Sequence, residues 1–384
     1  MNKRLFLKNL VAAAALLHLD SSTFAKDFSF NTKRLNILFL GGRGFLGPRI
    51  VKTLLEKGHR VTLLNRGITN PGLFQNLPLF VCDREKEHKK GLYDVRDQIN
   101  DSKWDCVIDT WQKSPKAVLD FIQEFDSNIG HYHYISSFSV YDSWNKKGID
   151  ENEKLNPVPE FPKSVSSSYR YAIRKTLSEL ALMDHRGLDW TIYRCHGIRS
   201  DRIPDAGNPH EEPYWPVRFL QGGDILLPDI KNHNIQMTDA KSLSNFIAHC
   251  AEHKIEGAFN VAYPSFPFKE YIASLSKVTQ VKGGLCWVPF EFLIQQKIKP
   301  REELEYWTRS NGGYYFSVQK ALEKGLTNRP LSEMLQDQID GYLRRYPEND
   351  FRFGGFHDGA TVKLSSKKEE RVLRAWNSYN SQNN

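Results

Sequence analysis

A short apolar run followed by a glycine-rich turn constrains this chain more than any other feature of its sequence. Residues 36–40 read Asn-Ile-Leu-Phe-Leu, which is typical of a buried parallel strand, and four of the next seven residues, 41–47, are glycines. Apolar residues then recur at helical spacing over 50–55, Gly58 ends that helix, and 61–64 is a second strand-like run. This order of strand, turn, helix and strand predicts the first unit of a dinucleotide-binding α/β fold.

Three glycines of the turn have separate tasks in such a fold. Gly41 permits the tight turn after the strand, and Gly44 lets backbone N–H groups approach a pyrophosphate. Gly47 allows the helix to pack closely on the strand, and the helix N-terminus favours negative charge. An ordinary glycine turn would not need the flanking strands and helix. The predicted pyrophosphate-binding residues are Gly41, Arg43, Gly44, Phe45, Leu46 and Gly47.

The end of the second strand indicates which dinucleotide to expect. An NAD site usually places an Asp or Glu there to bind the ribose 2′-hydroxyl, but this strand ends in Asn65 and Arg66. An arginine suits the 2′-phosphate of NADP, and Arg43 and Arg66 could bind that phosphate together. We therefore favour NADP over NAD. The alternative is that Arg66 is an ordinary surface arginine.

Two further strand-like runs end in polar residues. Residues 79–82 lead into Asp83 and Arg84, and residues 105–110 end at Thr110. In a parallel sheet such ends lie at the edge where ligands bind. We expect Asp83 to bind the adenine amino group, Arg84 to lie in the same cofactor site, and Thr110 to border the nicotinamide ribose.

The alternation of strands and helices predicts an α/β fold. It is a doubly wound parallel Rossmann sheet with a smaller C-terminal substrate-binding region. We assign 34–199 and 232–262 to the NAD(P)-binding domain, and 200–231 with 263–345 to the substrate-binding region.

A serine, a tyrosine and a lysine form the candidate catalytic set. Tyr171 and Lys175 are four residues apart, so they lie on one helix face. Lys175 can hold a ribose and lower the pKa of Tyr171 through its charge, and Tyr171 then acts as general acid and base. Ser137, in the strand and turn over 133–141, positions the substrate oxygen. The tyrosine–lysine spacing is common by chance, but its place after a nucleotide-binding half favours catalysis.

These motifs together resemble the extended short-chain dehydrogenase/reductases, the NAD-dependent epimerase/dehydratase family. The resemblance covers roughly residues 35–345 and lies in the segments 41–47, 135–141, 171–175, 193–198, 235–240 and 257–261. It implies an NAD(P)-dependent oxidoreductase or epimerase that acts on a secondary alcohol of a carbohydrate-like substrate. It also implies that Ser137, Tyr171 and Lys175 are catalytic, because they occupy the family's motif positions.

Three departures from the family pattern limit the chemistry. Sugar-nucleotide 4,6-dehydratases carry an Asp-Glu pair where this chain has Phe138 and Ser139, which argues against elimination of that kind. Cys195 stands where the family usually has a proline, directly after the arginine of the sixth strand. His196 follows, where the nicotinamide and substrate pockets should meet. It is either a second acid–base group or a packing residue.

The segment 64–67, Leu-Asn-Arg-Gly, is similar to an atypical branch of the family that includes the chloroplast stem-loop-binding proteins. That branch touches RNA, so a nucleic-acid-binding Rossmann protein is an alternative function. A second alternative is an oxidative glycoside-cleaving enzyme with a tightly bound cofactor. An inactive cofactor-binding scaffold is disfavoured by the complete catalytic set.

Aromatic and basic residues after the sixth strand suggest a sugar-binding surface. Tyr214 and Trp215 could stack on sugar faces, and Arg218 could bind an anion. The alternative is that these residues anchor the smaller lobe. With Ser139 and His196 they complete the predicted substrate-binding residues.

Both ends of the chain differ from the middle. Residues 1–25 combine a basic start, a short apolar run and Thr-Phe-Ala at 23–25, which predicts a secretory signal of the twin-arginine or ordinary type. A buried N-terminal helix is the alternative. We expect a periplasmic protein, or a cytoplasmic one if residues 1–25 are not a signal. Residues 346–384 read as a polar tail with a short helix over 367–376.

The charge and the cysteine content limit which binding partners we expect. The formal charge is +8, but the basic residues are interleaved with acids, so we expect a solvated surface and no nucleic acid partner. The five cysteines show no C-x-x-C spacing, so neither a metal site nor a disulfide framework is indicated. The expected partner is a small carbohydrate-like molecule, without a membrane span after signal removal. A homo-oligomer is compatible with the sequence.

Overall fold

The computed structural model describes residues 33–86, 89–144, 146–158, 171–201, 213–300, 302–306, 315–348 and 364–383. Leu35–Asn384 make up one compact unit. The signal predicted over 1–25 lies outside the described residues and stays a prediction.

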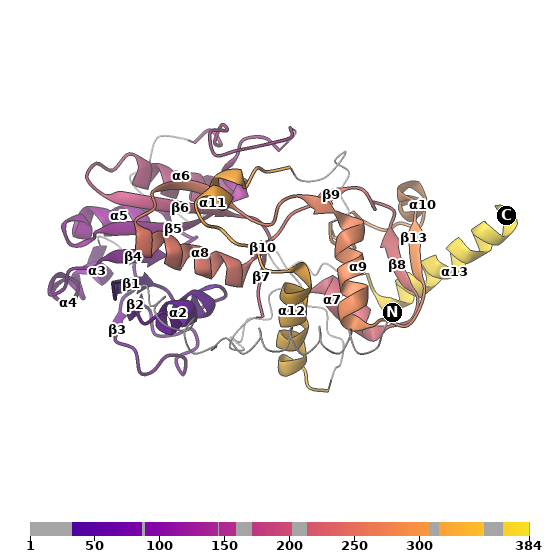
Figure 1. Cartoon of the computed structure of the whole chain (residues 1–384), viewed down its shortest axis with the longest axis horizontal. Helices are drawn as coiled ribbons and strands as arrows, with labels where there is room; N and C mark the ends of the chain where they lie inside the picture. Colours follow the sequence, from indigo (N-terminus) through magenta and orange to yellow (C-terminus); the bar gives the residue numbers. More distant parts are fainter. Residues whose placement is uncertain are drawn as a thin grey trace, which may run out of the picture. The chain divides into compact units, whose positions relative to one another are not determined.

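A seven-stranded parallel sheet forms the centre of one lobe of this unit (Figure 1). Its strand order is β11-β6-β5-β4-β1-β2-β3, with the crossover between β1 and β4 that characterises a doubly wound sheet. The predicted fold class is therefore confirmed. The strands are β1 (Asn36–Leu40), β2 (Arg60–Asn65), β3 (Leu79–Val81), β4 (Cys106–Asp109), β5 (His131–Ser137), β6 (Asp189–Cys195) and β11 (Gly257–Val261).

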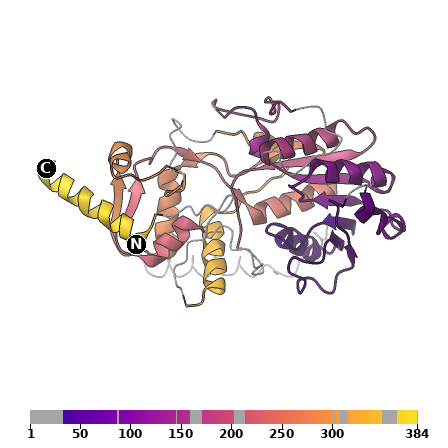
Figure 2. The same ribbon diagram turned by 180° about the vertical axis from the view of Figure 1, so that it is seen from behind.

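Helices cover both faces of the sheet (Figures 1 and 2). On one face α2 (Gly47–Glu56) packs against α8 (Ala240–His253), and on the other α5 (Pro115–Phe125) packs against α6 (Tyr171–Met183). The sheet lies between these layers, so strands such as β1 are buried along nearly their whole length, which explains the continuous apolar run over 37–40. Shorter helices on this lobe are α3 (Lys90–Tyr93), α4 (Arg96–Asn100), η2 (Asp126–Asn128), η3 (Phe138–Val140) and α11 (Gln319–Glu323).

A second lobe has its own hydrophobic core. Trp215, Phe268 and Leu335 are buried in it, and a two-stranded parallel sheet joins residues that are distant in sequence. Its elements are α7 (Tyr214–Gln221), β8 (Ile225–Pro228), α9 (Phe268–Thr279), β13 (Leu285–Val288), α10 (Phe290–Gln295), α12 (Leu331–Arg345) and α13 (Ser366–Asn383). Two short strand pairs are β7 (Ile198–Arg199) with β10 (Thr238–Asp239) and β9 (Asn234–Ile235) with β12 (Phe266–Pro267). Their strands lie in the segments where the chain passes from one lobe to the other.

The structure differs from the sequence-based domain boundaries in two places. α11 lies in the expected substrate region, yet Ala321 and Leu326 belong to the core under the large sheet. At the C-terminus, α13 is longer than expected, and it is not only a polar tail. Val372 is buried in the core of the second lobe, because one face of this amphipathic helix packs inward.

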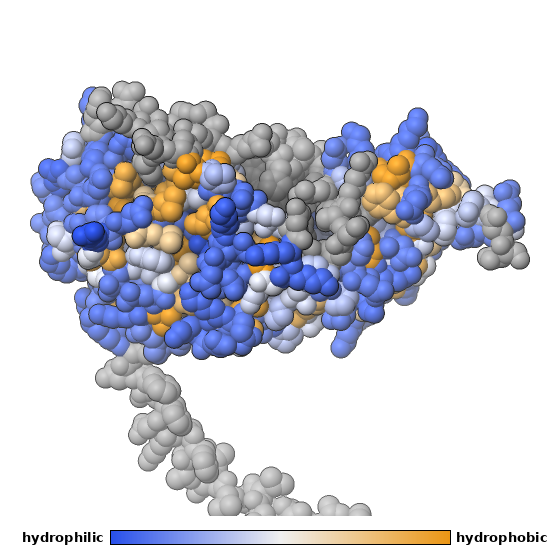
Figure 3. Space-filling model, turned by 90° about the horizontal axis from the view of Figure 1, so that it is seen from above, coloured by the Kyte–Doolittle hydropathy of each residue, from blue (hydrophilic) through white to orange (hydrophobic). Residues whose placement is uncertain are grey.

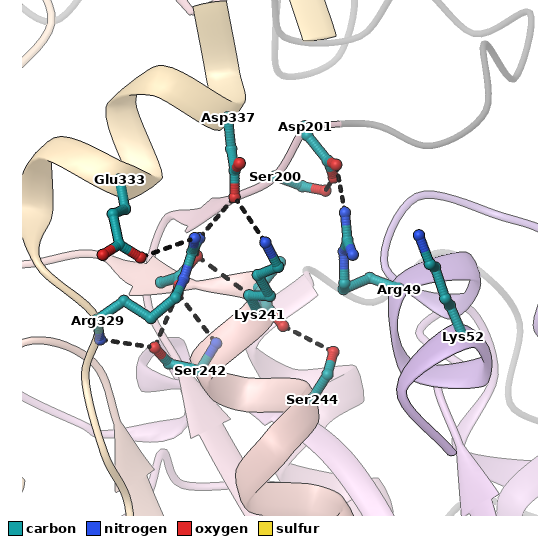
Figure 4. Close-up of polar contacts among 12 residues, drawn as sticks. Arg49, Lys52, Ser200, Asp201, Lys241, Ser242, Ser244, Arg329, Glu333 and Asp337 are labelled. Carbon is teal, nitrogen blue, oxygen red and sulfur yellow. Dashed lines mark hydrogen bonds and ion pairs between the residues drawn. The ribbon is translucent and has the colours of Figure 1, made fainter. Parts of the chain in front are cut away.

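Two charged contacts join the nucleotide lobe to α12 of the second lobe (Figure 4). Arg49 on α2 pairs with Asp201, whose backbone carbonyl accepts a hydrogen bond from Arg344 of α12. Asp239 caps α8 and also pairs with Arg329 at 2.8 Å, and Arg329 reaches Asp337 of α12. These contacts hold α12 against both helices of one sheet face.

The surface of the described residues is mixed in polarity. On the face seen in Figure 3, apolar side chains reach the surface in separate patches, one of them at the end of the second lobe. In the described part of the chain, no helix has both the length and the apolar character that a bilayer span requires.

We predict that Glu369→Ala on α13 lowers the free energy of unfolding by about 3–5 kcal/mol. Glu369 and Arg218 form a buried pair at 2.8 Å, and the substitution would leave the guanidinium buried without its carboxylate. Urea denaturation measures the change. Glu370→Ala, at an exposed position next to it, is the control and should change stability by less than about 0.5 kcal/mol. Equal losses in both variants would contradict a structural role for the pair.

Candidate functional site

The glycine turn after β1 brings backbone close to backbone. A Cβ atom on Gly47 would lie 2.7 Å from the Cα of Gly42, so helix α2 can approach the turn only without a side chain there. Gly41 has a φ of +118°, which favours glycine. Leu46 is the N-cap of α2 and makes no side-chain cap hydrogen bond. The turn therefore has the geometry that a pyrophosphate site needs.

Asn65 at the end of β2 holds this turn in place. Its side-chain amide donates to the Gly41 carbonyl at 2.7 Å, and its side-chain oxygen accepts from the Gly67 N–H at 2.8 Å. Both ends of the side chain are thus used by the two neighbouring loops. The side chain of Asn65 therefore shapes the two loops at which a cofactor is expected.

The two arginines expected at the 2′-position have different surroundings. Arg43 is only 5% exposed, and its Nε has no hydrogen-bond partner among the described residues. Arg66 is exposed at the end of β2. Phe45, in the turn with Arg43, is 43% exposed, whereas Leu46 is buried.

Of the residues that follow β3 and β4, one lies against the glycine turn and others bind elsewhere within the protein. Thr110 lies against the glycine turn, since its Oγ1 is 2.8 Å from where a Cβ of Gly41 would be. Asp83 is half-buried and its side chain accepts from the Glu85 N–H. Arg84 is buried, and its guanidinium binds Asp109 rather than projecting toward a ligand.

The buried pair of Arg84 and Asp109 is the main electrostatic feature at this edge of the sheet. Both oxygens of Asp109 accept from Arg84, at 3.0 and 2.9 Å. The Tyr132 hydroxyl donates to the same carboxylate at 2.5 Å, and the Trp111 N–H does so at 2.8 Å. Arg84 also donates to the Ala117 carbonyl. The Arg84 side chain is therefore an internal counter-ion, which corrects its expected role in cofactor binding.

Strand β5 and helix α6 supply the candidate catalytic set. Ser137 ends β5, is half-buried, and accepts a hydrogen bond from the Ser139 N–H at 3.2 Å. Tyr171 is the first described residue of α6 and is 40% exposed, whereas Lys175 one turn later is 2% exposed. The helix thus presents its tyrosine to solvent and its lysine to the interior.

Lys175 is held by oxygen atoms of the chain itself. Its Nζ donates to the backbone carbonyls of Trp111 at 3.0 Å and Ile135 at 2.5 Å. A third hydrogen bond goes to the Tyr134 hydroxyl at 3.1 Å. Burial lowers the pKa of Lys175 to about 8, and Asp109 opposes this shift. The lysine is therefore mostly charged at neutral pH and loses its charge at mildly alkaline pH.

An aromatic group lies beside the serine at the end of β5. Phe138 stacks on His196 with ring centroids 5.6 Å apart, and Phe316 stacks on the same Phe138 ring at 4.1 Å. Trp144 meets His196 edge-on. His196 is half-buried, and its backbone exchanges hydrogen bonds with Thr238. This packing favours the structural interpretation of His196.

Ser139 contributes a buried hydroxyl to this region. Its Oγ has no hydrogen-bond partner among the described residues, while its carbonyl accepts from Asn156. Such an orphaned hydroxyl next to Ser137 is consistent with the expected contact to a substrate.

Tyr214, Trp215 and Arg218 do not form the expected sugar-binding surface. Tyr214 and Trp215 are buried in the core of the second lobe, so their rings are not available for stacking on a sugar. Arg218 is buried against Glu369 and donates to two further backbone carbonyls. The alternative interpretation, an anchor for the smaller lobe, is the one that the packing supports.

The sequence reasoning missed a second buried network behind the site. Arg194, at the end of β6, pairs with Glu179 of α6 at 2.8 Å and also donates to the Tyr141 hydroxyl. Tyr141 in turn donates to Asn260 on β11. Glu179 lies four residues after Lys175, so the helical spacing was the signal that could have indicated an inward-facing partner. Among the described residues no group of His, Cys, Asp or Glu side chains could hold a metal ion.

Comparisons with known proteins agree with this architecture. No family model matches the chain. It is 20% identical over 274 residues to a UDP-N-acetyl-alpha-D-glucosaminuronate decarboxylase of Bacillus cytotoxicus, which covers 66% of this chain and 83% of that protein.

Solved structures cover more of the chain. The UDP-glucose 4-epimerase of Thermotoga maritima, solved with UDP-glucose, superposes with a TM-score of 0.58 at 17% identity, over 81% of this chain and 99% of that one. The Bordetella bronchiseptica enzyme WbmH, solved with NAD+, gives a TM-score of 0.59 at 17% identity, over 82% and 99%. The expected resemblance is thus confirmed for the fold.

Proposed function

Given the fold that it shares with NAD-dependent sugar-nucleotide epimerases, we propose that this chain is an NAD(P)-dependent enzyme acting on a secondary alcohol of a carbohydrate-like substrate. The observation that carries this proposal is the placement of Tyr171 and Lys175 on one helix, with Ser137 at the adjoining strand end. The glycine turn follows the end of β1, which lies at the same carboxyl edge of the parallel sheet as the end of β5. Of the two reaction types, we favour epimerisation over net oxidation.

The residues at the glycine turn fit a dinucleotide. The contact of Gly47 with Gly42 leaves no room for a side chain, and the N-cap of α2, Leu46, makes no side-chain cap hydrogen bond. Gly41, Arg43, Gly44, Phe45, Leu46 and Gly47 would hold the pyrophosphate, with Thr110 beside the turn and Asp83 at the adenine end. When bound, the nicotinamide would supply the group that accepts a hydride from the substrate and can give it back.

The chain's own residues would move the proton. The exposed Tyr171 phenol takes or gives the proton of the substrate hydroxyl, and Ser137 orients that oxygen. The positive charge of Lys175 favours the phenolate form of Tyr171, because opposite charges stabilise each other in a partly buried site. Above a pH of about 8 Lys175 loses that charge, so its support for the phenolate declines.

The cofactor preference that we propose is NADP over NAD. The side chain of Asn65 is engaged by two loops, and an acid is missing from the end of β2. Arg43 carries a buried Nε without a described partner, which a phosphate oxygen could satisfy. Solved neighbours of this fold bind NAD, so the preference would be a property of this chain.

We also propose that turnover is redox-neutral and that the cofactor stays bound. The support is the export signal expected over residues 1–25, because an exported enzyme has no evident pool of reduced nicotinamide. An enzyme that returns the same hydride to its substrate does not need one. Epimerisation is the simplest such reaction, ahead of oxidative glycoside cleavage.

Replacement of Tyr171 tests the general acid–base role. We expect Tyr171→Phe to reduce turnover by about 100-fold or more while dinucleotide binding is unchanged, since only the phenolic O–H is lost. Turnover is measured by NMR of the product sugar with UDP-glucose and UDP-N-acetylglucosamine as probes, and binding by titration calorimetry. Tyr379→Phe, on an exposed tyrosine of α13, is the control. Activity within about tenfold of the wild type would refute the role.

Replacement of Arg66 tests the cofactor preference. We expect Arg66→Ala to weaken NADP binding about tenfold or more and NAD binding by less than about twofold, because only NADP carries the 2′-phosphate. Calorimetric titration with each dinucleotide gives both dissociation constants. Arg60→Ala, at the opposite end of β2 and also exposed, should change neither. Equal weakening for the two dinucleotides would overturn the preference.

Retention of the cofactor tests the redox-neutral cycle. Protein purified without added cofactor is denatured, and the supernatant is assayed for nicotinamide dinucleotide. We expect a near-stoichiometric amount, because a recycled cofactor does not need to leave. An apo preparation that oxidises its substrate only with added NAD(P)+, with reduced cofactor accumulating over many turnovers, would contradict the proposal.

A further inference from the structure

Lys175 has a complete set of hydrogen-bond acceptors within the protein. An ammonium group has three N–H donors, and the three chain oxygens described above accept one hydrogen bond each. Two of these acceptors are backbone carbonyls, which no substitution removes. The third is the hydroxyl of Tyr134, which is therefore the part of this arrangement that the amino-acid sequence specifies.

Tyr134 contacts the lysine in two ways. Its hydroxyl oxygen accepts from Nζ at 3.1 Å while its own O–H donates to the Trp111 carbonyl at 2.9 Å. Its ring lies below the ammonium group, with Nζ 4.5 Å from the ring centroid. Burial raises the pKa of Tyr134, so the phenol stays neutral and its oxygen remains an acceptor. The Trp111 carbonyl accepts from both residues and closes a triangle of hydrogen bonds.

The carboxylate of Asp109, which acts on Lys175 through charge, is engaged elsewhere. Asp109 is fully buried, and its two oxygens are bound by Arg84 and Tyr132. Glu179, on the helix of Lys175, is paired with Arg194. Lys175 is thus buried beside two carboxylates that already have partners, and its direct contacts are neutral oxygens.

From this geometry we infer that Tyr134 is a positioning residue, whose hydroxyl holds the Lys175 ammonium group at its place between β5 and α6 and favours its charged form. This inference deepens the proposed function, because the charge of Lys175 acts there on Tyr171. It concerns a residue outside the candidate catalytic set, whose hydroxyl contacts Lys175 and the Trp111 carbonyl.

Several other groups around Lys175 could also shift its pKa. Asp109 on β4, Glu179 and Arg174 on α6, and Cys195 on β6 all act on it through charge. Tyr171 faces Tyr134 from the start of α6. Removal of the Tyr134 hydroxyl leaves all of these in place and retains the ring below the ammonium group. It removes the acceptor of Lys175 together with the hydrogen bonds of that hydroxyl to the Trp111 carbonyl and to Ser178.

The experiment compares two tyrosines of the same strand. Tyr132 and Tyr134 are two residues apart on β5 and both fully buried, but the hydroxyl of Tyr132 binds Asp109 while that of Tyr134 binds Lys175. The Lys175 side chain is titrated by NMR in protein with isotope-labelled lysine, and Lys175→Met identifies its signal. The wild-type midpoint is expected near 8.

We expect Tyr134→Phe to lower that midpoint by about one pH unit, because the charged form loses an acceptor that the neutral form uses less. Tyr132→Phe should lose a similar amount of stability with an unchanged midpoint. If both variants keep the wild-type midpoint, or both shift it equally, the inference is wrong.

A measurement on the wild-type protein covers the case in which Tyr134→Phe does not fold. The ring signal of labelled Tyr134 should titrate with the midpoint of Lys175 and lose this step in Lys175→Met. A Tyr134 signal that is flat through that range would also overturn the inference. Neither readout needs a cofactor or a substrate, so a failure here is distinguishable from a failure of the proposed function, which would leave Lys175 titrating as expected without turnover.

Discussion

The close contact between Gly42 and Gly47 is the constraint on which the nucleotide half depends. It sets how near α2 can come to the end of β1, and Thr110 and Asn65 then fit against the same turn. A side chain at Gly47 would push the helix away from the sheet and would break both arrangements. The turn, the helix N-terminus and the strand ends are therefore one unit in space, although they come from three parts of the chain.

Buried charge is the second organising feature. Asp109 with Arg84, Glu179 with Arg194, and Glu369 with Arg218 are each removed from water, and removal of one member of such a pair is costly. In the first two pairs both carboxylates already have an arginine partner, and among the described residues the direct contacts of Lys175 are neutral oxygens. The third fastens the C-terminal helix to the second lobe.

Ion pairs connect the two lobes, in addition to the chain segments that run between them. Arg49 and Asp239 extend from the helices on one face of the sheet to Asp201 and Arg329 beside α12. Because Arg49 lies in the first turn of α2, the helix that would face the pyrophosphate is tied directly to the lobe expected to hold the substrate. This connection makes the relative position of the two halves depend on a few partly buried ion pairs.

The sequence alone determined the parallel sheet and the glycine turn, and it predicted the candidate catalytic set of Ser137, Tyr171 and Lys175, because each depends on local spacing or on periodicity. It could not determine which polar side chains face inward. Arg84 and Arg218 look like ligand-binding residues until the tertiary structure places Asp109 and Glu369 beside them, from positions 25 and 151 residues away. Likewise Tyr134 is an ordinary strand residue until α6 brings Lys175 over its ring. Long-range pairing of this kind has no local pattern, since it depends on how separate elements pack, and only the folded chain decides it.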